Sequence, residues 1–203
     1  MKSITTIFFD IGGVCLTNGW DNIAREKATI KFSLDYEELE KRHEPVFKKF
    51  EKGKLSLDEY LDKVVFFRKR RFNKPEFIEF MYSQSHPHNS TIKLLNSLSL
   101  NRKYHLATIN NESLELNQYR INKFKLKKYF LNFFSSCYVG TRKPEPEIFL
   151  KALHILQRNP EECLFIDDSE KNYQSAKHLG INSIHLEYPA ELKERLTDFN
   201  IEI

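Results

Sequence analysis

The chain alternates short apolar runs with amphipathic stretches. Five apolar runs have the length and the β-branched or aromatic content of strands, and they lie at residues 4–9, 104–109, 133–139, 163–166 and 183–186. Between the later runs, apolar residues recur at helical spacing over residues 89–98, 112–128, 147–157 and 172–179. Because strands separated by helices form parallel sheets, the pattern predicts an α/β fold with a parallel sheet.

The segment after the first strand has a different pattern, with helical spacing and no strand-like run. Residues 36–50 carry apolar side chains at helical spacing, and Ser56 and Glu59 form a capping box that opens another helix. Pro75 fits the first turn of a further helix that ends near Tyr82. We therefore predict a core domain of residues 1–16 and 88–203, with an inserted helical cap over residues 17–87.

Length and composition narrow the class of protein. The 203 residues fit a core with a modest insertion, and 40% hydrophobic and 30% charged residues exclude disordered and collagen-like chains. The 32 Lys and Arg against 28 Asp and Glu leave a net charge of +4, which is too small to indicate a nucleic-acid scaffold. An anionic small-molecule ligand is compatible with this charge.

The cysteines and the first apolar run indicate in which cellular compartment the protein is expected. Cys15, Cys137 and Cys163 lie far apart without a CxxC pair, which favours reduced core thiols in a cytosolic protein. The first apolar run contains threonine and stops at Asp10, which favours a strand over a signal peptide. No stretch approaches the ~20 apolar residues of a membrane span. We predict a cytoplasmic protein with no membrane and no nucleic-acid partner.

Polar residues follow several of the predicted strands. They are Asp10 with the pair Gly12 and Gly13, then Asn110 and Asn111, then Lys143, then Asp167 and Asp168. The carboxyl ends of parallel strands meet at one edge of a sheet, where ligands bind. Ordinary loop polarity explains Asn110 well, but it explains two adjacent acids after a buried strand poorly, because such acids repel unless a cation joins them.

Three segments resemble sequence motifs of the haloacid dehalogenase superfamily. Residues 8–14 (FFDIGGV), 143–149 (KPEPEIF) and 164–169 (LFIDDS) with Asn172 match the first, third and fourth motifs in order and spacing. The resemblance is greatest to sugar-phosphate phosphatases and to the phosphatase domain of soluble epoxide hydrolases. It implies a Rossmann-like core with a helical cap inserted after the first strand, and displacement at phosphorus or at a carbon–halogen bond by an aspartate.

The residue types suit phosphoryl transfer. Asp10 would be the nucleophile, beside glycines whose backbone can approach a ligand closely. Asp168 and Asp167 would hold Mg²⁺ against Asp10, with the Gly12 carbonyl as a further ligand, since Mg²⁺ prefers oxygen donors. By resemblance, Asp168 is the direct ligand and Asp167 the more peripheral one. Lys143 would place a cation beside the attacked phosphate. A turn aspartate and a solvated surface lysine are the plain alternatives.

The second motif permits two registers. The family pattern has Ser or Thr at the end of the second strand, often followed by asparagine. Aligning Asn111 with that asparagine puts Asn110 at the Ser/Thr position, where its amide would donate to a phosphate oxygen; Thr108 is the alternative. Asn172 would form a hydrogen bond to a metal-bound water or would orient Lys143. The plain alternative is that Asn172 only begins a helix.

Gly12 departs from the family pattern. Phosphatases of the family usually carry a second aspartate two residues after the nucleophile, as general acid and base. Glycine cannot move a proton, which predicts a slow enzyme, a good leaving group or a substitute acid from the cap. Dehalogenases of the family also lack this acid, but they need no Mg²⁺, which leaves Asp167 and Asp168 unexplained.

Other polar segments are weaker candidates. Residues 68–71 (RKRR) form either a phosphate clamp or nuclear address, or a solvated helix end. His86 and His88, near the second connection to the cap, are candidates for the missing proton transfer. Asn18 and Trp20, at the mouth of the cap, are candidates for contact with substrate.

The residues together predict a Mg²⁺-dependent phosphatase that acts on a small phosphorylated metabolite through an aspartyl-phosphate. The alternatives are a haloacid dehalogenase-type hydrolase, and a catalytically weak relative that binds a phosphorylated ligand or a protein partner. Gly12 favours the last alternative, and the combination of Asp10, Lys143 and Asp168 argues against it.

Overall fold

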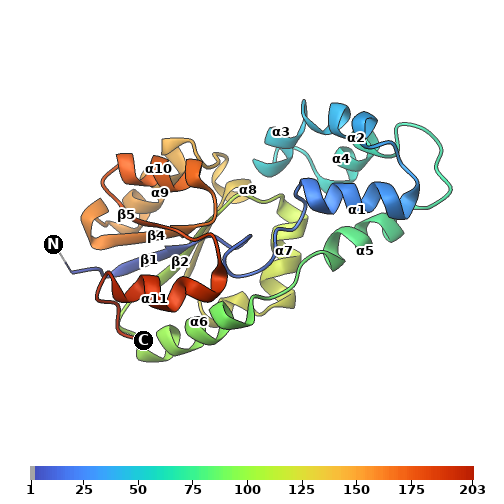
Figure 1. Ribbon diagram of the computed structural model, residues 1–203. Helices are drawn as coiled ribbons and strands as arrows, with labels where there is room; N and C mark the ends of the chain where they lie inside the picture. Colours follow the sequence, from blue (N-terminus) through green and yellow to red (C-terminus); the bar gives the residue numbers. More distant parts are fainter. Residues whose placement is uncertain (1–2) are drawn as a thin grey trace.

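Five short strands form one parallel sheet at the centre of the core. The computed structural model describes residues 3–203, and the sheet order is β3-β2-β1-β4-β5 (Figure 1). The strands are β1 (Thr6–Phe9), β2 (His105–Asn110), β3 (Asn132–Ser135), β4 (Cys163–Asp167) and β5 (Asn182–His185). The predicted α/β class with a Rossmann-like parallel sheet is confirmed.

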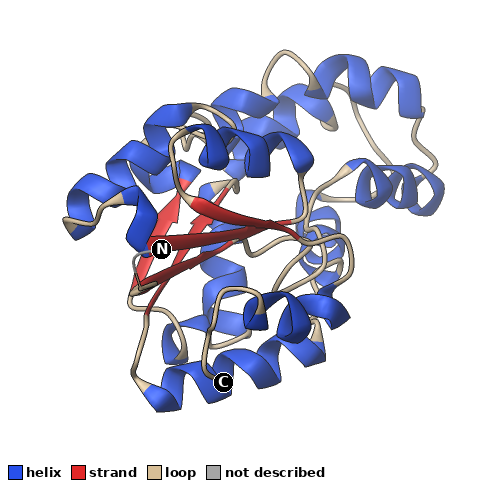
Figure 2. Cartoon of the chain, turned by 60° about the vertical axis from the view of Figure 1, so that its left-hand side comes forward, coloured by secondary structure: helices blue, strands red, loops and turns tan. Residues whose placement is uncertain are grey.

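Helices cover both faces of the sheet (Figure 2). Ile7 and Phe9 of β1 pack with apolar residues of α6 (Asn89–Asn101), α7 (Leu114–Lys123) and α11 (Leu192–Thr197). Phe8 faces the opposite side and packs with α9 (Pro146–Leu156) and α10 (Glu170–His178). Because side chains alternate along a strand and both faces are covered, apolar residues on both faces of the sheet are buried.

Three elements differ from the sequence prediction. The third strand ends at Ser135 rather than at residue 139, because Ser136–Val139 forms the short helix α8, which ends at Gly140 with a left-handed φ of 72°. The predicted helix through residue 128 ends at Lys123, since Lys125 is left-handed and is followed by the 3₁₀ turn η1 (Leu126–Lys128). The helix α11 (Leu192–Thr197) is not predicted from the sequence.

The cap consists of helices between β1 and α6. They are α1 (Asn22–Phe32), α2 (Tyr36–His43), α3 (Phe47–Glu51), α4 (Leu57–Val64) and α5 (Lys74–Ser83). The capping box of Ser56 and Glu59 is formed, and Pro75 lies in the first turn of α5. The helix predicted over residues 36–50 is instead two helices, because Pro45 has no N–H with which to continue the first. Within residues 3–203, no helix combines the length and apolar character that crossing a bilayer requires.

The cap has its own core, centred on the buried Tyr60. The Tyr60 ring stacks on Phe50 at 4.1 Å between centroids, and its hydroxyl accepts a hydrogen bond of 2.8 Å from the Trp20 indole. His43 Nδ1 lies 2.8 Å from the same hydroxyl. Burial, helped by the nearby Arg25 guanidinium, lowers the pKa of His43 to about 4.

This His43 shift predicts an acid-sensitive cap. The pKa of His43 is lower in the folded protein than in the unfolded chain. As pH falls from about 6.5 to 4, His43 therefore becomes protonated in the unfolded state but stays neutral in the native state. The free energy of unfolding should therefore decrease by about 2 kcal/mol between pH 7 and 4.5 through this group. Urea titrations across this range should show a weaker pH dependence for His43→Gln than for the wild type. His154→Gln, at an exposed histidine, is the control, and an equal weakening in both variants would contradict the assignment.

Candidate active site

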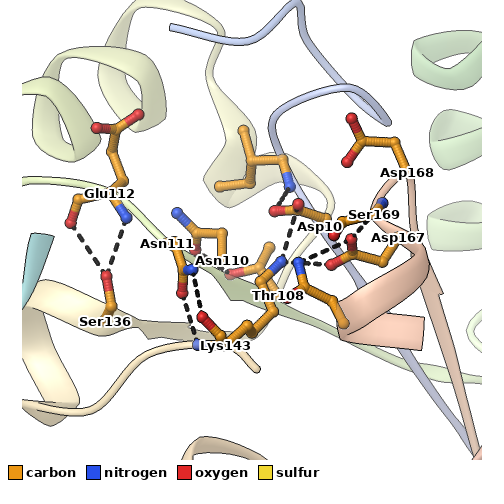
Figure 3. A network of polar contacts seen from close by, with 12 residues as sticks. Asp10, Thr108, Asn110, Asn111, Glu112, Ser136, Lys143, Asp167, Asp168 and Ser169 are labelled. Carbon is orange, nitrogen blue, oxygen red and sulfur yellow. Dashed lines mark hydrogen bonds and ion pairs between the residues drawn. The ribbon is translucent and has the colours of Figure 1, made fainter. Parts of the chain in front are cut away.

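A buried lysine joins two aspartates at the carboxyl edge of the sheet. Lys143 Nζ lies 2.8 Å from Asp10 Oδ2 and 2.5 Å from Asp167 Oδ2 (Figure 3). Asp10 directly follows β1, and Asp167 ends β4, the neighbouring strand. Lys143 is only 1% exposed, so the attraction within this triad is weakly screened by solvent. The structure thus brings together three of the residues predicted from the strand ends.

Asn111 fixes the backbone that carries Lys143. Its Oδ1 accepts from the Lys143 backbone N–H at 2.8 Å, and its Nδ2 donates to the Lys143 carbonyl at 2.9 Å. These two bonds tie the end of β2 to the lysine segment. The predicted site residue Asn111 therefore positions Lys143 through its main chain.

Asp167 is fully hydrogen-bonded. Its Oδ1 accepts from the backbone N–H of Ser169 at 2.8 Å and from Asn172 Nδ2 at 3.0 Å, while Oδ2 receives Lys143. Its carboxylate is completely buried. Asp167 therefore anchors the lysine, which agrees with the peripheral place predicted for it, and Asn172 acts on Lys143 through Asp167.

The carboxylate of Asp168 has few hydrogen-bond partners. Among the described residues, it accepts one side-chain hydrogen bond, a long one of 3.5 Å from Asn18 Nδ2. One carboxylate oxygen each from Asp10, Asp167 and Asp168 lies within 4.8 Å of the others. A cluster of hard oxygen donors, in which Asp168 has no close partner among the described residues, fits a divalent cation such as Mg²⁺.

The electrostatics of the cluster also favour a cation. Burial raises the pKa of Asp10 to about 8; Lys143 opposes this, and the neighbouring Asp167 and Asp168 carboxylates add to it. Burial and Asp167 likewise raise the pKa of Asp168. Three carboxylates share a single lysine here, so a bound divalent cation would offset the excess negative charge and favour ionised Asp10.

The two glycines after Asp10 have different roles. Gly13 has a φ of 70°, and a Cβ on it would lie 2.0 Å from Asp168 Oδ2. Gly12 has no such backbone constraint, but a Cβ there would lie 2.6 Å from Asn18 Oδ1. Gly13 is therefore the position where only glycine permits the approach of Asp168.

We expect Gly13→Ala to disrupt the site. The methyl group must displace the Asp168 carboxylate, so turnover and Mg²⁺ affinity should fall on the order of 100-fold. Steady-state kinetics and a Mg²⁺ titration followed by thermal unfolding would measure both. Gly180→Ala is the matched control, because Gly180 is also left-handed, with φ 81°, but its Cβ would meet only Pro160 at 3.6 Å. Equal effects of the two variants would show that backbone strain alone accounts for the loss.

The second motif differs from the predicted register. Asn110 is 2% exposed, its Nδ2 donates to Asn117 Oδ1 at 3.1 Å, and its Oδ1 accepts from Ser135 Oγ at 2.8 Å. Thr108 is fully buried and points to Asn110 at 3.5 Å. These alternate residues of β2 face α7 rather than the cavity. The structure brings Asn111, and neither Asn110 nor Thr108, to the cavity wall.

A cavity of about 470 Å³ lies above the triad, between core and cap. On the core side it is lined by Asp10, Gly12, Asn111, Lys143, Asp168 and Asn172. On the cap side its walls include Asn18, Trp20, Arg25, Phe47, Phe50 and Glu51. The two candidates at the mouth of the cap, Asn18 and Trp20, therefore do line the cavity.

The other candidates lie elsewhere. His86 and His88 line a separate hollow of about 420 Å³ beside the connections to the cap, which also touches Asn18 and Asp168. Arg68 pairs with Glu38 on the cap surface at 2.5 Å, and Arg70 donates to the Val65 carbonyl. The basic segment 68–71 is therefore not a clamp on this cavity.

Sequence reasoning missed a buried ion pair in the cavity wall. Glu112 Oε2 accepts from Arg120 Nη1 at 2.9 Å, and Arg120 Nη2 donates to the Thr17 carbonyl at 2.6 Å. Burial raises the pKa of Glu112, against the opposing effect of Arg120. Glu112 directly follows Asn111, which was a usable signal, whereas nothing in the spacing marks Arg120 among the charges of α7. The pair ties the end of β2 to the first connection of the cap.

The arrangement has the groups that attack on a phosphate dianion requires. A carboxylate, a buried ammonium and a second carboxylate with free oxygens meet at the floor of one cavity. The sequence also matches the family model of haloacid dehalogenase-like hydrolases over residues 4–180. The chain belongs to this family.

Curated relatives of this haloacid dehalogenase-like hydrolase include a hydrolase and a phosphatase by name. It is 30% identical to the chloroplast flavin mononucleotide hydrolase 1 of Arabidopsis thaliana, over 81% of this chain and 66% of that protein. It is 29% identical to D-ribitol-5-phosphate phosphatase of Bacteroides thetaiotaomicron, over 96% and 97% of the two chains. The predicted family and the hydrolase class are confirmed.

Solved structures agree with the fold. A haloacid dehalogenase family enzyme of Bacteroides thetaiotaomicron, in complex with magnesium and inorganic phosphate, superposes with a TM-score of 0.75 at 25% identity. The match covers 90% of this chain and 93% of that one. The predicted magnesium requirement is therefore supported both by the acid cluster and by this relative.

Proposed function

We propose that this hydrolase is a Mg²⁺-dependent phosphatase that acts on a small phosphorylated metabolite through an aspartyl-phosphate on Asp10. The observation that carries the proposal is the buried Lys143 held between Asp10 and Asp167, with Asp168 beside them. Within residues 3–203, Asp168 has no close side-chain partner. This arrangement supplies a nucleophile, a fixed cation and a metal-binding carboxylate at one cavity floor. The names of the relatives support phosphate esters as substrates.

Asp10, Lys143 and the metal-binding acids have distinct roles in the proposed reaction. A carboxylate oxygen of Asp10 forms a bond to phosphorus while the ester oxygen leaves with the P–O electron pair. The Lys143 ammonium donates hydrogen bonds to phosphoryl oxygens as their charge grows. Asp10, Asp168 and the Gly12 carbonyl would hold Mg²⁺, which when bound offsets the negative charge of the phosphate. Water then attacks phosphorus, which frees Asp10 and inorganic phosphate.

The dehalogenase alternative fits the site less well. Displacement of a halide by Asp10 needs no divalent cation, so it gives no reason for Asp168 to lie beside Asp167 without a close partner. The alternative of a purely binding protein leaves the cost of burying Lys143 with two acids unexplained. Gly12 is the feature in its favour, because glycine has no side chain that could act as a general acid.

A substrate screen tests the proposal. Purified protein would be offered phosphorylated metabolites, including flavin mononucleotide and ribitol 5-phosphate, with Mg²⁺ or with EDTA. We expect release of inorganic phosphate that requires Mg²⁺. Activity on 2-haloacids in the presence of EDTA, with none on phosphate esters, would overturn the proposal.

Asp168→Ala should separate metal binding from folding. The buried strand before it is unchanged, so the fold should persist, while loss of the carboxylate should abolish Mg²⁺-dependent turnover. Thermal unfolding should show that Mg²⁺ raises the melting temperature of the wild type and not of the variant. Asp198→Ala, at an exposed aspartate near the C-terminus, is the control and should keep both responses. Unchanged turnover in Asp168→Ala would remove this residue from the site.

A further inference from the structure

The space beside Gly12 is filled from another part of the chain. A Cβ on Gly12 would lie 2.6 Å from Asn18 Oδ1 and 3.7 Å from the Asn18 Cγ. Two residues after the nucleophile there is thus no side chain, but the carboxamide of Asn18 occupies the room that such a side chain would take.

The backbone on both sides of Asn18 is firmly held. Thr17 Oγ1 donates to the Gln84 carbonyl at 2.8 Å, the Thr17 N–H donates to the His86 carbonyl at 2.8 Å, and Arg120 donates to the Thr17 carbonyl. Gly19 lies against Leu116, Arg120 and Glu112, which a Cβ would meet at 3.0 to 3.2 Å. Residues 17 and 19 are fixed in this way, so the position of Asn18 between them is set by the fold rather than by its own contacts.

The Asn18 carboxamide keeps most of its hydrogen-bonding capacity. Asn18 is exposed and lines the cavity. Among the described residues, its side chain makes one hydrogen bond, the 3.5 Å contact with Asp168. A primary amide offers two donors and an acceptor with two lone pairs. These groups lie next to Gly12, in the wall of the cavity that Asp10 and Lys143 also line.

Three acids of the cavity wall are engaged elsewhere. Glu112 is paired with Arg120, Glu51 with Arg142 at 2.5 Å, and Asp21 caps α1 by accepting from the Ala24 N–H. None of these three is free to fill the place beside Gly12.

We infer that Asn18 is a catalytic residue that replaces the side chain absent at Gly12. Its Nδ2–H₂ donates a hydrogen bond to the ester oxygen as the P–O bond breaks, and its Oδ1 accepts from the water that later attacks phosphorus. The amide transfers no proton: the departing oxygen takes its proton from water, and the attacking water loses its proton to solvent. This inference rests on the proposed phosphatase function.

The inference predicts an effect that depends on the leaving group. Asn18→Ala should lower kcat/KM for an alkyl ester such as glycerol phosphate about 10-fold, the effect of one hydrogen bond. For 4-nitrophenyl phosphate, whose leaving oxygen is stable as an anion, the loss should be less than about threefold. Most of the loss should lie in kcat rather than in KM, since the hydrogen bond strengthens as charge develops.

A swap variant distinguishes this role from a structural one. Gly12→Asn combined with Asn18→Ala returns an amide to the same space from residue 12, and the clash with Asn18 is removed. It should recover the alkyl-ester rate to within about threefold of wild type. Asn96→Ala, on the exposed side of α6, is the control and should change neither substrate. Mg²⁺ should still raise the melting temperature of Asn18→Ala, which would show that the metal site is intact.

The outcomes separate this inference from the proposed function. If the wild type hydrolyses both esters and Asn18→Ala lowers both equally, or neither, the inference is overturned while the phosphatase assignment stands. If the swap fails to restore the alkyl-ester rate although it binds Mg²⁺ as the wild type does, the inference is also overturned. If the wild type releases phosphate from neither ester nor from any metabolite in the screen, the proposed function falls, and this inference with it.

Discussion

Asp10→Asn is expected to lower the rate of phosphate release more than about 10⁴-fold, because the variant removes the nucleophile of the proposed reaction. An amide oxygen attacks phosphorus far more weakly than a carboxylate does. The substitution keeps the size of the side chain, and the amide oxygen can still accept the 2.6 Å hydrogen bond from the Ile11 N–H. The loss should therefore appear in turnover and not in folding.

The melting temperature of Asp10→Asn should equal or exceed that of the wild type. Burial raises the pKa of Asp10 to about 8, which means that the protein bears a cost for holding this carboxylate ionised. Single-turnover kinetics, with mass spectrometry to exclude deamidation back to aspartate, would measure the effect on chemistry. Asp58→Asn, at an exposed cap residue paired with Lys74, is the control and should remain active. An Asp10→Asn variant with more than a few percent of wild-type turnover would identify another nucleophile.

Lys143→Met is expected to lower kcat on the order of 10³-fold, since it removes the fixed cation that faces the phosphoryl oxygens. It should also destabilise the fold by roughly 3 kcal/mol, because Asp10 and Asp167 would remain buried without their shared partner. Lys151→Met, at an exposed lysine of α9, is the control for the substitution and should leave kcat within twofold of wild type.

The stability loss in Lys143→Met should depend on pH. The folded pKa of Asp10 already lies above its ordinary value, and removal of the opposing lysine should raise it further. Below the wild-type pKa of about 8, both proteins hold Asp10 protonated, so this residue adds little to the difference in stability there. Above that pH only the wild type ionises Asp10 beside a lysine, so urea titrations should show a larger deficit at pH 9.5 than at pH 7. A deficit that grows toward low pH would contradict this account of the triad.

The sequence was most informative where local signals and chemistry coincide. Strands such as β1 and β4 are short apolar runs that stop at acids, so Asp10, Asp167 and Asp168 could be assigned to the sheet edge before any coordinates. The inserted cap was predicted from the change from alternating strands and helices to helices alone. The capping box at Ser56 could be predicted because its two residues lie only three positions apart.

What the sequence does not predict depends on strand register and on contacts far apart in the chain. Asn111 reaches the cavity wall and the adjacent Asn110 does not, because neighbouring strand residues face opposite sides. The filling of the space at Gly12 by Asn18, and the pairing of Glu112 with Arg120, depend on where loops cross in three dimensions. No periodicity in the sequence carries that information.

The central claim is that Asp10 becomes phosphorylated during turnover, and acid quenching followed by mass spectrometry tests it directly. With 4-nitrophenyl phosphate the first step should be fast, so the intermediate should accumulate before water attacks it. The account predicts one phosphoryl group on the peptide that contains Asp10 in the presence of Mg²⁺, and none with EDTA or in Asp10→Asn. Steady release of phosphate with no phosphoryl group on Asp10, or with one on a different residue, would contradict it.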